Sequence, residues 1–223
     1  MSSGYAIMIL SPQVKKDHYR FDSYMSKSRW LSIWHQMDEI QRLKPGSVLE
    51  VGPGSGLLKK VAQLFGIHIE TLDHDPQLSP DYVASVSALP FREASFDVVC
   101  AFQVLEHLPY EVALPAFAEM ARVTRRHLVI SLPDARLTWR YVIHVPGIPT
   151  FEFLIPKPQL SMPPNNFNGE HYWEINKHGY PLKRVISDLA AIIPLIDTYR
   201  VPENPYHRFL LFDRQGVLRL SNR

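Results

Sequence analysis

The sequence has one cysteine, no long hydrophobic run and no large excess of one charge, and each shortage excludes a class of protein. A single cysteine, Cys100, excludes a disulfide framework, and its apolar surroundings indicate a buried, unreactive thiol. No apolar run approaches the roughly 18 residues of a membrane-spanning helix. The first residues also lack the charged and apolar regions of a signal peptide. We therefore expect a cytoplasmic protein without a membrane partner.

The charge pattern argues against a nucleic-acid partner. The formal net charge is only +2, and basic residues occur in pairs such as Lys15-Lys16 and Arg125-Arg126, not in runs. Nucleic-acid binding normally needs a concentrated basic surface. The 223 residues are 46% hydrophobic and 21% charged, which is typical of one globular domain. We expect a small-molecule partner, and the sequence does not indicate the oligomeric state.

A glycine-rich segment at 48–57 is the most informative part of the chain. The apolar run V-L-E-V leads directly into G-P-G-S-G-L. Glycines let the backbone turn sharply and approach a ligand closely, and the N-terminus of a following helix favours polar ligand groups. A dinucleotide fingerprint, G-x-G-x-x-G, needs a third glycine where Leu57 stands, so NAD is disfavoured. A tight strand-to-helix turn without a ligand is the alternative interpretation.

An acidic residue follows at the spacing expected for ribose recognition. Residues 67–73 alternate like a strand and end in Asp73, 19 positions after Gly54. An acidic side chain about 20 positions after such a loop binds ribose hydroxyls. Asp73 can instead cap the next helix, although Asp75-Pro76 is itself a good helix start.

Three further motifs complete an ordered set. The segments are A-L-P-F at 88–91, S-F-D-V-V-C-A-F at 95–102 and Q-V-L-E-H-L-P at 103–109. Together with the glycine loop they resemble the class I (Rossmann-like) S-adenosylmethionine-dependent methyltransferases over about residues 45–135. The resemblance implies an α/β fold: a doubly wound, mostly parallel seven-stranded sheet with helices on both faces and a closing antiparallel C-terminal hairpin. In this family the fourth strand is 95–102, and V-L-E-H-L opens the next helix.

The resemblance also implies a cofactor, S-adenosyl-L-methionine, and a set of residues around it. The glycine loop would pack on the amino-acid end of the cofactor and Asp73 on its ribose. Ser85 stands where the family often has an aspartate for the adenine, so the Val86 backbone would share that role. The acceptor would meet the methyl group above Phe102 and Gln103. The expected cofactor-binding residues are Glu50, Gly52, Pro53, Gly54, Gly56, Asp73, His74, Ser85, Val86, Phe102 and Gln103.

We divide the single domain into four regions. Residues 1–44 are an N-terminal helical region, with one helix from about Asp22 to Leu43 and an apolar stripe on one face. Residues 45–134 are the cofactor-binding core. Residues 135–180, rich in proline and aromatic residues, are expected to form a substrate lid, or else a cover for a sheet edge. Residues 181–223 hold the last helix and closing strands at 196–201 and 208–212. The stripe consists of Trp30, Ile33, Met37 and Ile40, and in the resembling family Tyr24, Arg29 and Trp34 would line the substrate pocket.

The predicted reaction is methyl transfer to an oxygen or nitrogen of a small molecule. The chain lacks the Asn- or Asp-Pro-Pro-aromatic motif typical of enzymes that methylate amide or base nitrogens. Two histidines are candidate general bases: His107, just after the fourth strand, and His171, among aromatic residues of the lid. A substrate amine that arrives deprotonated would need neither.

The ten histidines form no H-E-x-x-H or Cys-rich pattern, so no metal site is predicted. A metal held by ligands from distant loops stays open. Two other functions also stay open: a non-catalytic S-adenosylmethionine-binding scaffold or regulatory subunit, and a Rossmann oxidoreductase.

Overall fold

A seven-stranded sheet forms the centre of the protein in the computed structural model, which describes residues 20–216. The strand order is β3-β2-β1-β4-β5-β9-β8. The first five strands of this order pair in parallel, whereas β9 is antiparallel to both of its neighbours. The predicted doubly wound sheet with a closing antiparallel hairpin is confirmed. Its strands are β1 (Val48–Val51), β2 (Glu70–Asp73), β3 (Tyr82–Val83), β4 (Phe96–Phe102), β5 (Thr124–Pro133), β8 (Leu195–Val201) and β9 (Asn204–Asp213).

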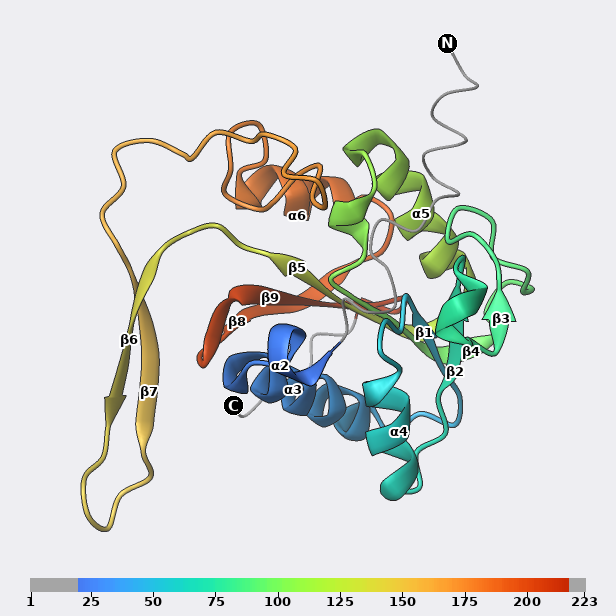
Figure 1. Ribbon diagram of the computed structural model, residues 1–223, viewed down its shortest axis with the longest axis horizontal. Helices are drawn as coiled ribbons and strands as arrows, with labels where there is room; N and C mark the ends of the chain where they lie inside the picture. The colour runs from blue at the N-terminus through green and yellow to red at the C-terminus, as the bar shows by residue number, and fades with distance from the viewer. Residues whose placement is uncertain (1–19, 217–223) are drawn as a thin grey trace.

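Helices cover both faces of the sheet. Figure 1 shows α3 (Lys27–Leu43) and α4 (Leu57–Leu64) below it, and α5 (Tyr110–Val123) and α6 (Leu182–Ala190) above it. Because the central strands are apolar on both sides, each helix pair closes its own buried cluster. Phe117 and Phe212 pack in the cluster under α5 and α6, and Ile40 and Phe209 in the cluster over α3 and α4.

The N-terminal helix differs from its prediction in two ways. It is divided into α2 (Phe21–Tyr24), which ends at its C-cap Met25, and α3, which Ser26 caps by accepting a hydrogen bond from Arg29 N (3.1 Å). The expected apolar stripe is also wrong at Trp30, which is 47% exposed. The buried face instead carries Ser32, Gln36, Glu39, Ile40 and Leu43. Ser32 and Gln36 line the cavity described below, and Glu39 accepts a hydrogen bond from Tyr199 OH (2.8 Å).

The resemblance implied that residues 104–108 open the next helix, and this expectation is wrong. They form a separate 3-10 turn, η3 (Leu105–His107), and α5 begins only at Tyr110. Pro109 explains the break, since a proline disfavours helical backbone in the residue before it but is well placed at a helix start. The closing hairpin turn is likewise shorter than expected, because Val201 already pairs with Asn204.

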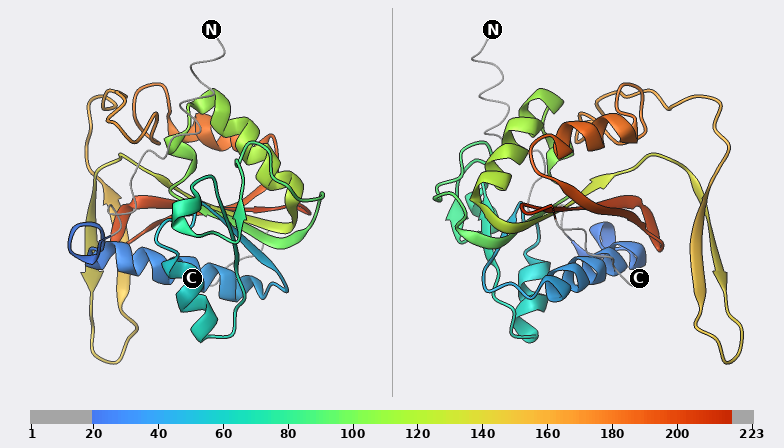
Figure 2. Two further views of the ribbon diagram at one scale, coloured as in Figure 1. Left: turned by 45° about the vertical axis from the view of Figure 1, so that its right-hand side comes forward. Right: turned by 180° about the vertical axis from the view of Figure 1, so that it is seen from behind.

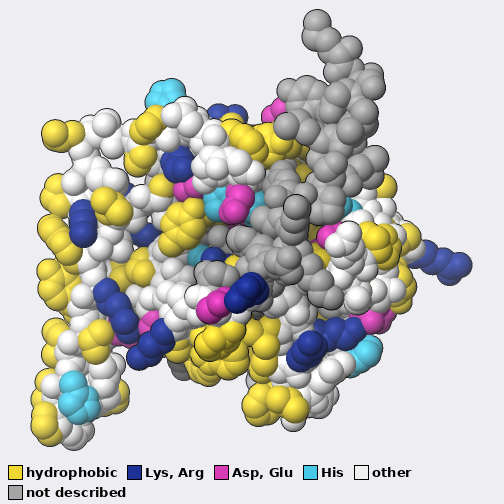
Figure 3. Space-filling view, viewed as in Figure 1, with side chains coloured by type: hydrophobic (Ala, Val, Ile, Leu, Met, Phe, Trp, Pro, Cys, Tyr) yellow, Lys and Arg dark blue, Asp and Glu magenta, His cyan; other side chains and the backbone are white. Residues whose placement is uncertain are grey.

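The expected lid contains a projecting hairpin. Strands β6 (Thr138–Ile143) and β7 (Phe151–Pro156) form a second sheet that stands away from the main one (Figures 1 and 2). Figure 3 shows hydrophobic side chains along this hairpin. Its register places six large apolar residues on one face, all at least 40% exposed: Trp139, Tyr141, Ile143, Phe151, Phe153 and Ile155. Within residues 20–216, no helix has the length and apolar character needed to cross a membrane.

Candidate active site

A cavity of about 400 Å³ opens at the carboxyl ends of β1 and β4. This is the edge at which open parallel sheets bind ligands. Its walls come from the glycine loop after β1, the first turns of α3, the segment after β4, residues 168–171 and the start of β9. The lining residues are Tyr24, Arg29, Ser32, Ile33, Gln36, Glu50, Gly52, Pro53, Gly54, Ser55, Leu57, Leu58, Phe102, Gln103, His107, Asn168, Glu170, His171, Tyr206 and His207.

The glycine loop has the backbone that its sequence predicts. Gly52, Gly54 and Gly56 all have positive φ angles, of 70°, 53° and 67°, which disfavour side chains larger than glycine. Gly52 N–H donates to the carbonyl of Leu72 (2.9 Å) and so ties the loop to β2. A Cβ atom at Gly52 would lie 2.6 Å from Val104 Cγ2. The loop therefore needs glycine both for its backbone angles and for its packing.

Glu50 places a buried carboxyl group in the cavity wall. It is 4% exposed, and among the residues that the structure describes its Oε2 atom has no hydrogen-bond partner. Burial raises the pKa of Glu50 to about 8, although the charge of Lys59 opposes this shift. A buried carboxyl without a partner is costly, so a cationic ligand group placed beside it would be strongly stabilised.

The second group of predicted cofactor residues lies outside the lining of the cavity. Asp73 accepts hydrogen bonds from the backbone N of Asp75 (2.9 Å), and His74 Nδ1 lies 3.2 Å from the same oxygen. Asp75, not Asp73, caps the turn η2 (Pro76–Leu78) by accepting from Gln77 N. Gly56, Asp73, His74, Ser85 and Val86 are the predicted residues outside the lining.

Gln103 links the cavity to a buried carboxyl. It is a non-glycine residue with positive φ (58°), held by a hydrogen bond from its N to the carbonyl of Ser131 (3.0 Å). In the amide orientation that satisfies its contacts, its nitrogen donates to Glu106 Oε1 (3.3 Å). Phe102 lies beside it in the lining, so both residues predicted for the methyl-transfer position face the cavity.

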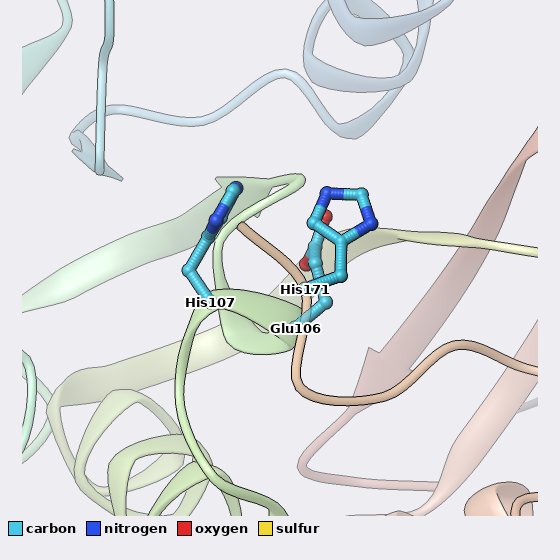
Figure 4. A group of neighbouring side chains, drawn as sticks. All are labelled: Glu106, His107 and His171. Atoms are coloured by element: carbon cyan, nitrogen blue, oxygen red, sulfur yellow. The ribbon is translucent and has the colours of Figure 1, made fainter. Parts of the chain in front are cut away.

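The two candidate histidines meet although they are far apart in sequence. The rings of His107 and His171 pack edge to face with 5.0 Å between centroids. Both line the cavity. Figure 4 shows them rising from η3 and from the loop before α6, with the Glu106 side chain close to that of His171. The loop is held against η3 by a hydrogen bond from Tyr172 N to the carbonyl of Glu106 (2.9 Å).

His171 belongs to a charged network. Its Nδ1 lies 3.1 Å from Glu174 Oε1, to which Lys177 Nζ also donates (2.8 Å). Burial alone would raise the pKa of Glu174, but the hydrogen bonds from His171 and Lys177 outweigh it and lower that pKa to about 2. Burial alone would lower the pKa of His171, but the hydrogen bond to Glu174 and nearby carboxylates raise it. The network therefore favours an ionised Glu174.

Sequence reasoning missed several residues of the site. Glu106 was visible only as part of the L-E-H motif, and nothing indicated that it is fully buried between the histidines. Tyr206 and His207 come from the start of strand β9, ahead of the closing strand that was predicted at 208–212. Burial, with help from the charges of Arg29 and His171, lowers the pKa of His207 to about 3.

The N-terminal helical region and the expected lid each supply only some of the predicted cavity-lining residues. Of the N-terminal candidates, Tyr24 and Arg29 line the cavity, whereas Trp34 does not and is 57% exposed. Of the expected lid, only Asn168, Glu170 and His171 reach the cavity, and the projecting hairpin does not.

Comparison with known proteins gives one family and many structures. The sequence model for the methyltransferase domain matches residues 49–130. Magnesium protoporphyrin IX methyltransferase from Synechocystis PCC 6803, solved with bound SAM, is 13% identical; the match covers 96% of this chain and 92% of that one, with a TM-score of 0.55. Burkholderia thailandensis 1,6-didemethyltoxoflavin-N1-methyltransferase is 14% identical, with coverages of 91% and 92% and a TM-score of 0.51.

A third structure is larger than this chain. The small RNA methyltransferase HEN1 is 12% identical with a TM-score of 0.61, and the match covers 87% of this chain but 26% of that one. At such identities these likenesses establish the fold. The search of curated proteins found no match.

Proposed function

We propose that the chain is a class I S-adenosylmethionine-dependent methyltransferase, as the match of residues 49–130 to the methyltransferase-domain model supports, and that it methylates an oxygen or nitrogen atom of a small molecule in the cytoplasm. S-adenosyl-L-methionine is its cofactor. The observation that carries the proposal is that predicted cofactor-binding residues and the two candidate general bases line the same cavity. The glycine loop and Glu50 form one side, and His107 and His171 form the other.

The residues of the first side fit the cofactor. Its methionine portion carries an ammonium group, and the unpartnered buried carboxyl of Glu50 is the complementary acceptor. The positive-φ loop leaves space around Gly56, where an added Cβ would meet nothing within 4 Å. We assign Gly52, Pro53, Gly54 and Gly56 to the methionine end, Asp73 and His74 to the ribose, and Ser85 and Val86 to the adenine.

The second side is proposed to hold the methyl acceptor. The acceptor oxygen or nitrogen forms a bond to the methyl carbon while the bond from that carbon to sulfur breaks, and the acceptor's proton must leave. Positioning supplies most of the rate of such a transfer. We assign the transfer position to Phe102 and Gln103, and the removal of the proton to His107 and His171, because all four residues line the cavity.

The charge of the cavity favours a small molecule over a nucleic acid. Among its described lining residues Arg29 is the only arginine or lysine, and a phosphate backbone usually needs several. A volume of about 400 Å³ is also within the usual range of small-molecule sites. The non-catalytic scaffold remains as the second candidate, since Ser85 replaces the family's usual adenine-binding aspartate.

Transfer of a labelled methyl group distinguishes a small-molecule methyltransferase from a non-catalytic scaffold. Purified protein is incubated with methyl-labelled S-adenosylmethionine and a fractionated metabolite extract, with an RNA pool in parallel. An enzyme that acts on small molecules labels a low-mass fraction, and His107→Ala with His171→Ala lowers that labelling while cofactor binding is retained. Cofactor binding without labelling of any fraction would support the scaffold, and labelled RNA would replace the proposed acceptor class.

A further inference from the structure

Three side chains beside the cavity have the composition of a metal site. Glu106, His107 and His171 each offer a ligand atom, and these atoms lie within 4.8 Å of one another. Two imidazoles and one carboxylate are a common ligand set for Zn²⁺ and for other divalent transition metals. Figure 4 shows the three side chains gathered in one place although His171 is 64 positions from His107 in sequence.

Hydrogen bonds orient both imidazoles for coordination. His107 Nδ1 donates to the backbone carbonyl of Glu170 (3.0 Å), because a carbonyl can only accept. His171 Nδ1 faces the ionised Glu174 at 3.1 Å. A carbonyl oxygen or a carboxylate oxygen therefore holds the Nδ1 side of each ring. Metal-binding histidines are held in this way, by a carbonyl or a carboxylate on the other nitrogen.

Glu106 supplies the independent observation. Its side chain is fully buried, and within the described part of the chain its Oε2 atom has no hydrogen-bond partner. The side-chain nitrogen of Gln103 donates only to the other Glu106 oxygen, Oε1. A buried carboxyl oxygen without a partner is costly, and a cation placed beside it would be stabilised. His107 and His171 are the neighbours that each offer a ring nitrogen within 4.8 Å of the Glu106 ligand oxygen.

We propose that Glu106, His107 and His171 bind one divalent transition-metal cation at the acceptor side of the cavity. This inference rests on the proposed function for its role: a hydroxyl or water bound to such a cation loses its proton more easily. His107 and His171 would then be ligands and not general bases, and the acceptor's proton would pass to solvent. Glu174 is a positioning residue that orients His171. No metal motif is visible in the sequence, because the ligands come from two separate segments.

The test is direct metal binding, without activity. Untagged protein is treated with EDTA, exchanged into metal-free buffer and titrated with Zn²⁺ by calorimetry. Mg²⁺ is the control cation, because it prefers oxygen ligands to imidazole. Cobalt titration adds a visible absorption spectrum that reports coordination. We expect one Zn²⁺ per chain and little binding of Mg²⁺. Glu106→Gln and His171→Ala should weaken Zn²⁺ at least about tenfold, and Glu174→Gln about 10- to 100-fold.

His144→Ala is the matched control, since His144 is exposed at the tip of the projecting hairpin. It should bind Zn²⁺ like the unchanged protein. Circular dichroism shows whether each variant is folded, and His107→Gln replaces any that is not. Absence of stoichiometric Zn²⁺ binding, or equal binding by the Glu106, His171 and His144 variants, overturns the metal site.

Titration of the same EDTA-treated sample with S-adenosylmethionine keeps the two proposals apart. Cofactor binding without Zn²⁺ binding rejects the metal site and leaves the methyl-transfer function. Specific Zn²⁺ binding without any cofactor binding upholds the cation site and rejects the proposed function.

Discussion

Asp134 Oδ2 accepts a hydrogen bond from Arg208 Nε at 2.7 Å, and this buried ion pair joins the end of β5 to β9. The Asp134 side chain is fully buried, and its other oxygen accepts from Asn176 (2.8 Å) and from Arg136 N (2.9 Å). One carboxylate therefore fixes the sheet and the loop that carries His171 to the cavity.

Replacement of this carboxylate should be strongly destabilising. Asp134→Ala leaves the largely buried guanidinium of Arg208 unpaired, and removal of one partner of a buried pair costs about 3–5 kcal/mol. Urea unfolding measures the loss. Asp38→Ala is the control, because its partner Arg42 is 45% exposed and a surface pair contributes at most about 1 kcal/mol. Equal losses in both variants would contradict this account.

The second prediction concerns the packing of the glycine loop. Gly52→Ala should destabilise the protein, since the new Cβ would meet Val104 Cγ2 at 2.6 Å. Val104→Ala removes the side chain that the new Cβ would meet. The double variant Gly52→Ala/Val104→Ala should therefore lose less stability than the sum of the losses in the two single variants. Gly56→Ala, where the space is open, should cost only the positive-φ strain of about 1 kcal/mol. Thermal unfolding of the unchanged protein, the three single variants and the double variant is the measurement. Strictly additive effects of Gly52→Ala and Val104→Ala would exclude the predicted clash.

Cofactor affinity should depend on pH through Glu50. Because burial raises the pKa of Glu50 to about 8, the free protein carries a neutral carboxyl below that pH. Binding an ammonium group favours the ionised form, so a proton must be released. Affinity should therefore rise with pH, by at most about tenfold per unit, up to about pH 8 and then level off. Calorimetry in buffers of different ionisation heat detects the proton.

Glu50→Gln supplies the control for this titration. The variant should bind S-adenosylmethionine more weakly and lose this pH dependence. It should also be more stable than the unchanged protein above about pH 8 without ligand, because a raised carboxyl pKa removes stability as pH rises from 4.5 through 8. An unchanged pH slope in Glu50→Gln would assign the titration to another group.

Asp73 and Asp75 should have separable roles. Asp73→Ala removes the proposed ribose acceptor, a charge-assisted hydrogen bond of about 1.5–3 kcal/mol, and should weaken the cofactor roughly 10- to 100-fold. Asp75→Ala removes the cap of η2 and should lower stability with little effect on affinity. The two variants are compared by cofactor titration and by thermal unfolding. The reverse pattern would make Asp73 the structural residue.

The sequence predicts the sheet well because its signals are local. The apolar strands ending at Val51 and Phe102 and the glycines between β1 and α4 each fix backbone geometry within a few residues. The break at Ser26 and the 3-10 turn before Pro109 were missed, since helical periodicity continues across both. Single capping and proline effects decide such boundaries.

The site is only partly predictable for a related reason. His107 and His171 were identified singly, but their 5.0 Å contact depends on how a long loop folds back over η3. Glu106 has the sequence appearance of an ordinary surface residue, and its burial follows from the same long-range packing. The hairpin between β6 and β7 was hidden by prolines that indicated irregular structure.

Calorimetric titration with S-adenosylmethionine, with NADH as the comparison, tests the central claim most directly. The account predicts binding of one S-adenosylmethionine per chain, loss of that binding in Gly54→Val while the fold is retained, and no binding of NADH. Tight binding of NADH, or wild-type S-adenosylmethionine affinity in folded Gly54→Val, would contradict the assignment of the glycine loop.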